Sequence, residues 1–335
     1  MKNLKNILLV SILLLISGSL TITPVVTKYY NGYSIYIILI TLILSILLIF
    51  LFDLSNIKIK TVLKPKYLRL LFIVYISISI IYIVSVLGTF INNISYTVTP
   101  MSIFIGVIMI ICIILSVNKR LININLFFVL NLFSIVILLF FSIFFPKSKL
   151  NLDFNLSNNN IFFLCNYLML FVDLIIYKLY FTTKSFKSTN VGYILGIIIS
   201  FLLLTYFAYI DLTLSAINYT NTYFSNILKF LLVVPSEIIY FDYLYLGIII
   251  ITLLFKLIIF EDTLRVLLLK KKSPIVNILI FTILFFTANT IINLVGQDEL
   301  FVSTICLILS NISILIILIF GGVKIVTRIY QQIKK

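Results

Sequence analysis

Residues 7–30 read ILLVSILLLISGSLTITPVVTKYY. Up to Val26 this stretch is long and apolar enough to cross a bilayer, which takes about 20 such residues. Its middle, residues 17–24, is nevertheless rich in residues that interrupt a helix. Pro24 has no N–H and clashes with the carbonyl four residues back, and Gly18 costs about 1 kcal/mol in a helix interior. The stretch therefore predicts a membrane helix that is broken near its centre.

A broken membrane helix leaves backbone N–H and C=O groups that must meet protein, ligand or water, and transporters with such helices bind small substrates there. Five residues of the break are therefore candidate substrate-binding residues: Gly18, Ser19, Thr21, Thr23 and Pro24. One alternative is a simple kink, because small residues also favour close helix packing. A cleaved signal peptide is the other, since Lys2 and Lys5 precede the apolar run. The apolar run continues beyond the small residues, so we expect an uncleaved span.

The composition of the chain excludes a soluble enzyme. Of its 335 residues 62% are hydrophobic and 10% are charged, against about 45–50% and about 25% in soluble domains. The absence of histidine excludes a catalytic histidine and a histidine-ligated metal. The three cysteines lie far apart in apolar runs, which is typical of buried small residues. We expect an α-helical membrane protein with no enzymatic activity, no metal site and no cofactor.

Ten segments are apolar enough to span a bilayer, and together they make the whole chain, residues 1–335, one integral membrane domain. The predicted spans are 7–27, 33–52, 67–91, 101–117, 124–145, 161–181, 191–211, 239–268, 274–295 and 300–323. Thr99 and Pro100 form a helix-start signal before the fourth span. Between the seventh and eighth spans, Ile227 to Val234 followed by Pro235 predicts a short interfacial or re-entrant helix.

Positive charges are distributed unevenly over the loops of this ten-span topology. The net charge is +15, from 25 Lys and Arg against 10 Asp and Glu. With a cytoplasmic N-terminus, 20 of the 25 basic residues fall on the inner side and 4 on the outer side, and Lys256 lies within the eighth span. Cytoplasmic loops carry such an excess in membrane proteins. The charge thus predicts that both termini are cytoplasmic, and it needs no nucleic-acid partner as an explanation.

A polar outer loop at residues 146–160 divides the spans into two sets of five. Because five is odd, the second set is inverted relative to the first, which is the topology of inverted-repeat transporters. The halves show no clear sequence repeat, so helix count alone carries this inference. We predict an all-α polytopic fold with ten transmembrane helices in a 5+5 inverted repeat, LeuT-like, with the first and sixth helices broken.

Span six should hold the break that matches span one, and it carries Asn166 and Asp173. A carboxylate inside a membrane span costs a few kcal/mol and normally faces a partner or a cavity. Tyr177 lies four residues later on the same helix face and is a candidate donor to Asp173. Asn166 and Asp173 are therefore predicted to bind substrate. The alternative is a structural carboxylate that a neighbouring helix satisfies.

Span eight holds several charges within its predicted bounds. Asp242 lies near its outer end and Lys256 near its middle, and Glu261 and Arg265 have the spacing of a local ion pair at its inner end. In a transporter-like fold, a lysine such as Lys256 can stand where a cation would otherwise bind. Alternatively, Lys256 pairs with a carboxylate of the bundle such as Asp173. We assign Lys256, Asp242 and Tyr177 to coupling or gating.

Four of these features together resemble one family. They are the break from Gly18 to Pro24 followed by Tyr33, the Thr99-Pro100 element, Asp173 in span six, and PSEIIYFDYLYLGI at residues 235–248. With them the chain resembles the B subunits of spore germinant receptors, the GerAB-like endospore germination permeases. These are similar to ten-helix amino acid/polyamine/organocation transporters. The chain departs from the family in lacking the usual Arg in the segment around Asp242 and in having no Trp.

The resemblance implies a sensor of a small nutrient. An amino acid-like germinant would bind at the midplane, between the broken helices and spans three and eight. An A-type subunit and a lipoprotein C-type subunit in the spore inner membrane would read the resulting shift in conformation. One alternative is a proton- or cation-coupled amino acid transporter of the cell membrane. A membrane glycan polymerase or flippase is less expected, because such polymerases usually carry a large outer loop with Arg and His.

Overall fold

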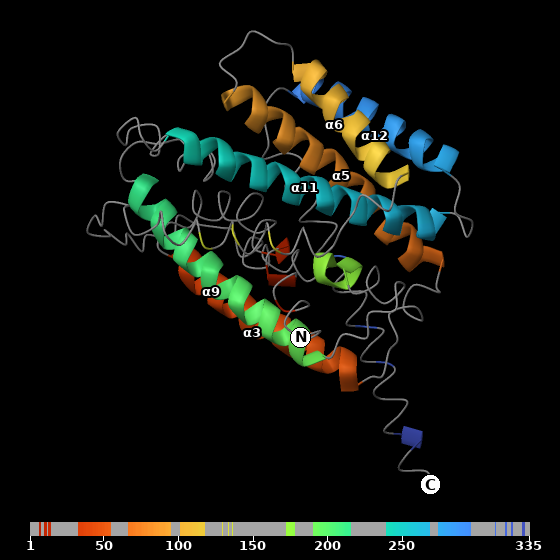
Figure 1. The fold of residues 1–335 in the computed structure, drawn as a ribbon. Coiled ribbons are helices and arrows are strands. Elements are labelled where there is room, and N and C mark those ends of the chain that lie inside the picture. Colours follow the sequence, from red (N-terminus) through yellow and green to blue (C-terminus); the bar gives the residue numbers. More distant parts are fainter. Residues whose placement is uncertain are drawn as a thin grey trace.

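The computed structural model describes seven continuous stretches and a set of isolated residues. The stretches are residues 33–54, 66–94, 101–117, 172–177, 190–215, 239–268 and 274–295, and the isolated residues are 7, 10, 11, 13, 14, 129, 133, 136, 312, 319, 323, 330 and 331. Every described residue is helical, as expected of an α-helical protein. Figure 1 shows α3 (Tyr33–Leu54), α5 (Lys66–Ile94), α6 (Met101–Val117), α9 (Asn190–Ser215), α11 (Ile239–Leu268) and α12 (Pro274–Val295).

These six helices lie in six of the ten segments that the sequence predicts as spans. Helix α6 begins directly after the Thr99-Pro100 signal, and Pro274 occupies the first position of α12, where its missing N–H has no helical partner to lose. The structure describes only parts of segments 7–27, 124–145, 161–181 and 300–323. The short helix predicted around residues 227–234 lies outside the described residues.

The helices form two packed groups (Figure 1). Helices α5, α6, α11 and α12 each contact the other three, so they make one four-helix group. Helices α3 and α9 pack along each other as a pair. Neighbours in the chain are therefore not always neighbours in space. Helix α9 packs on α3, although α5 and α6, which lie between them in the sequence, belong to the four-helix group.

Arg69 connects α5 to one end of α11 through hydrogen bonds. Its guanidinium, near the start of α5, donates to the carbonyl of Leu267 and, at 3.4 Å, to that of Leu268. The last carbonyls of an α-helix have no partner within the helix, and a cation there is favourable. Since the first turn of α5 meets the last turn of α11, the two helices run antiparallel.

The outward faces of the helices are apolar. On α3 the exposed residues Tyr36, Ile40, Ile43 and Leu47 recur at helical spacing, and on α12 the same holds for Ile275, Leu279, Ile283 and Phe286. Soluble proteins rarely expose contiguous apolar stripes of this kind. Among the described stretches, Lys66–Val84 of α5 is by length and composition able to cross a membrane. Four shorter apolar stretches lie in α3, α6, α9 and α12.

The beginning of the chain packs against α9 at Gly196. A Cβ atom added to Gly196 would lie 2.9 Å from the carbonyl oxygen of Ile7 and 3.1 Å from the Val10 side chain. Small residues permit this close approach between helices. Val10 and its neighbours Ser11, Leu13 and Leu14 are buried. The first predicted span is thus anchored on α9 just before its predicted break.

Candidate functional site

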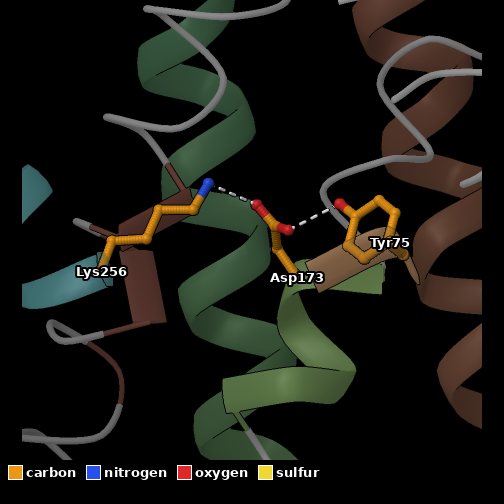
Figure 2. A network of polar contacts seen from close by, with 3 residues as sticks. All are labelled: Tyr75, Asp173 and Lys256. Carbon is orange, nitrogen blue, oxygen red and sulfur yellow. Dashed lines mark hydrogen bonds and ion pairs between the residues drawn. The ribbon is translucent and has the colours of Figure 1, made fainter. Parts of the chain in front are cut away.

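A buried ion pair joins the helical segment 172–177 to the middle of α11. The Lys256 ammonium lies 2.8 Å from the Asp173 carboxylate, and the two side chains are 3% and 1% exposed. Figure 2 shows the Asp173 carboxylate between the ammonium on one side and the ring of Tyr75 on the other. Two residues separated by 83 positions in the sequence thus form one charged centre inside the bundle.

Tyr75 of α5 is the second hydrogen-bond donor to the Asp173 carboxylate. Its hydroxyl donates a 2.8 Å hydrogen bond to Oδ1 of Asp173, while Lys256 contacts Oδ2. Tyr75 is fully buried. Hydrogen bonds to an ionised acceptor are about twice as strong as neutral ones. Asp173 is therefore held by two side chains that both belong to the four-helix group.

One aromatic ring lies close to the ammonium, and a second ring packs against the first. The Lys256 Nζ lies 5.0 Å from the centroid of Phe260, one turn further along α11, in the range of a cation–π interaction. The Tyr177 ring lies 6.1 Å from the Phe260 ring, between centroids. Tyr177 and Phe260 are both fully buried. The ion pair thus lies in apolar surroundings, where screening by water is weak.

The energetics of such a pair are finely balanced. Two unit charges 2.8 Å apart attract by about 6 kcal/mol at an effective dielectric constant of about 20. Taking both charges out of water offsets much of this attraction, and replacing a buried pair by apolar residues is often neutral or even stabilising. Stability alone is therefore a weak reason for the pair.

A second set of buried charges lies near the C-terminal end of α11. Arg265 forms an ion pair with Asp262, three residues before it, at 2.6 Å. The sequence favoured Glu261 as its partner, but side chains three and four residues apart both share a helix face. Glu261 is fully buried, and so is Cys112 of α6, whose thiol is free. Among the described residues, no group of three or more His, Cys, Asp or Glu side chains could hold a metal ion.

The structure brings together two of the residues that the sequence singled out. Asp173 and Lys256 form the pair that the sequence left open as an alternative, and Tyr177 lies beside it. Asp242 belongs to the first turn of α11, but its side chain lies outside the description. The remaining predicted site residues lie outside the described residues: Gly18, Ser19, Thr21, Thr23, Pro24 and Asn166.

Sequence reasoning missed Tyr75. A tyrosine in an apolar helix is common, and its acceptor lies 98 residues further along the chain. The only signal was the hydroxyl itself, because a buried phenol usually finds a hydrogen-bond partner. The tyrosine that donates to Asp173 is therefore Tyr75 on α5, whereas the sequence proposed Tyr177 on the same segment as Asp173.

Comparisons with known proteins add no relative. No protein-family model matches the chain, and neither the curated proteins nor the solved structures give a significant match.

Proposed function

We propose that this chain is an integral membrane protein of the cell or spore inner membrane, with ten helices and both termini in the cytoplasm. The apolar outward faces of α3 and α12 suit a lipid environment. The Arg69 contact supports the topology, because the start of span three and the end of span eight are both predicted on the inner side. The distribution of 20 basic residues inside against 4 outside supports the same orientation.

Helix packing supports two inverted sets of five helices. In a ten-span count, α3, α5 and α6 are the second, third and fourth helices of the first set, and α9, α11 and α12 are their equivalents in the second. Each of these helices contacts its own equivalent: α3 packs on α9, α5 on α11 and α6 on α12. Repeats related by a two-fold axis in the membrane plane place equivalent helices around that axis.

Within this fold the protein acts as the transporter-like subunit of a spore germinant receptor and binds an amino acid-like nutrient. The observation that carries this proposal is the buried pair of Asp173 and Lys256. A zwitterion offers a carboxylate to Lys256 and an ammonium to Asp173, so neither buried charge loses a partner. A ligand with one charge leaves the other side chain unpaired, which costs several kcal/mol. The break that the sequence predicts in the first helix is proposed to supply further polar contacts.

Binding at the pair provides the signal. Lys256 and Tyr75 belong to the four-helix group, whereas Asp173 belongs to the segment 172–177. A nutrient inserted between Lys256 and Asp173 lengthens this connection and shifts the population toward another packing of the bundle. Tyr177 and Asp242 are proposed to gate this change. The A-type subunit and the lipoprotein C-type subunit read it.

A proton- or cation-coupled amino acid transporter is the second candidate. The observation that favours it is the full burial of the Lys256 ammonium, which places a fixed positive charge where a transporter could hold a cation. The two candidates use the same site. They differ in whether substrate crosses the membrane, and a transport assay measures this directly.

The experiment compares germination with transport. Spores that carry Asp173→Ala or Lys256→Met should lose their response to amino acids while the protein stays in the membrane. Ser200→Ala is the matched control, because the Ser200 hydroxyl is bonded within α9 itself. Normal germination of a deletion strain on every nutrient contradicts the receptor. Accumulation of labelled amino acid in vesicles, abolished by Asp173→Asn, instead favours the transporter.

A further inference from the structure

Ser79 of α5 carries a buried hydroxyl that its own helix does not use. The residue is 1% exposed. Its Oγ atom has no hydrogen-bond partner among the described residues. A buried polar group without a partner is unfavourable and calls for a physical reason.

Other hydroxyl groups in these helices are satisfied locally. Each of the following donates to a carbonyl three or four residues earlier in its own helix: Thr41, Ser200, Thr205, Thr263, Thr282, Thr287 and Thr290. This local bond is the usual arrangement for serine and threonine inside a helix. Ser79 departs from it, so its hydroxyl remains available for a group that is not part of α5.

Two features of its position on α5 relate Ser79 to the ion pair. It follows Tyr75 by four residues and therefore shares the helix face whose tyrosine reaches Asp173. Arg69 and Leu267 fix a common end for the antiparallel helices α5 and α11. At about 1.5 Å per residue, Ser79 lies roughly 15 Å from that end along α5, and Lys256 roughly 16 Å along α11. Ser79 and Lys256 therefore lie at about the same distance from the shared end of their two helices.

We infer that Ser79 is a ligand-binding residue of this site, and that its hydroxyl donates to the carboxylate of a ligand held by Lys256. The inference rests on the proposed function and adds a residue to it. Lys256 and Ser79 then bind the carboxylate end of the ligand, while Asp173 binds the ammonium end. A hydroxyl donor beside the ammonium favours a carboxylate over an amide, because hydrogen bonds to charged groups are the stronger ones.

The test replaces Ser79 by alanine in the full-length protein, purified in detergent. No hydrogen bond among the described residues is lost in the ligand-free protein, so its thermal stability stays equal or rises. Affinity for a panel of α-amino acids falls about 10- to 100-fold, as for the loss of a bond to a charged group. Affinity for the matching amino amides, which have no carboxylate, changes little. The preference for acid over amide therefore shrinks.

Ser200→Ala is the control, since its hydroxyl donates to Ile197 within α9 at 2.8 Å. Equal amino acid affinities in Ser79→Ala, Ser200→Ala and the wild type overturn the inference. So does a Ser79→Ala protein that loses stability and binds acids and amides equally less well, because that indicates a structural role. If either outcome is seen for Ser79→Ala but Lys256→Met abolishes binding in the same assay, only the role of Ser79 is refuted and the proposed site at Lys256 stands. If the wild type binds no amino acid, the proposed function fails as well.

Discussion

Replacing Lys256 by methionine tests the energetics of the buried pair. Methionine keeps most of the length of the side chain and removes its charge, which leaves Asp173 buried with only Tyr75 as a hydrogen-bond donor among the described residues. Removing one partner of a buried ion pair costs about 3–5 kcal/mol. This range agrees with the attraction of about 6 kcal/mol for charges 2.8 Å apart, reduced by relaxation of the site. We expect Asp173→Leu alone to cost a similar amount.

The double variant Asp173→Leu with Lys256→Met should behave differently from either single one. Its free energy of unfolding should lie within about 1 kcal/mol of the wild type, because apolar replacement of a whole buried pair is often neutral or stabilising. The assay is an equilibrium unfolding titration of the four proteins in mixed micelles, read as a double-mutant cycle. A coupling energy below about 1 kcal/mol, or a double variant whose loss equals the sum of the two single losses, refutes this reasoning.

Three further changes test separate contacts. Tyr75→Phe removes the phenol donor to Asp173 and should lower the free energy of unfolding by about 1.5–3 kcal/mol, measured in the same titration. Arg69→Gln removes the cation at the end of α11 and should weaken that end by about 0.5–2 kcal/mol, seen as faster amide hydrogen exchange in its last turn and unchanged exchange at its middle. Gly196→Ala should destabilise the protein, because the new Cβ meets the Ile7 backbone at 2.9 Å. Gly106→Ala is its control and should be neutral or stabilising, since nothing lies within 4 Å; equal behaviour of the two alanines contradicts the close packing at Gly196.

The helices could be predicted because their signals are local. Long apolar runs, the Thr99-Pro100 start and the proline at position 274 define segments without any knowledge of tertiary contacts. The sequence therefore placed α3, α5, α6, α9, α11 and α12 closely. The packing of α3 on α9 is not local, and no pattern within either segment indicates it.

The charges of the site could be predicted individually, but not all of their partners. Asp173 and Lys256 stand out because an isolated charge in an apolar span is costly and needs a partner. Tyr75 and Ser79 do not stand out, because hydroxyl residues are common in membrane helices and their role depends on which face meets the pair. The partner of Arg265 could not be predicted either, because the carboxylates of Glu261 and Asp262 both lie within its reach along the helix.

Direct ligand binding tests the central claim that a small zwitterion replaces the internal ion pair. The measurement is equilibrium binding of radiolabelled α-amino acids to the purified wild-type protein and to the stable double variant Asp173→Leu with Lys256→Met. We predict saturable binding to the wild type and at least about a 100-fold loss in the double variant, since two charged contacts of about 1.5–3 kcal/mol each are removed. Equal affinity of the two proteins for every amino acid that binds would contradict the account, because the ligand would then bind without the pair.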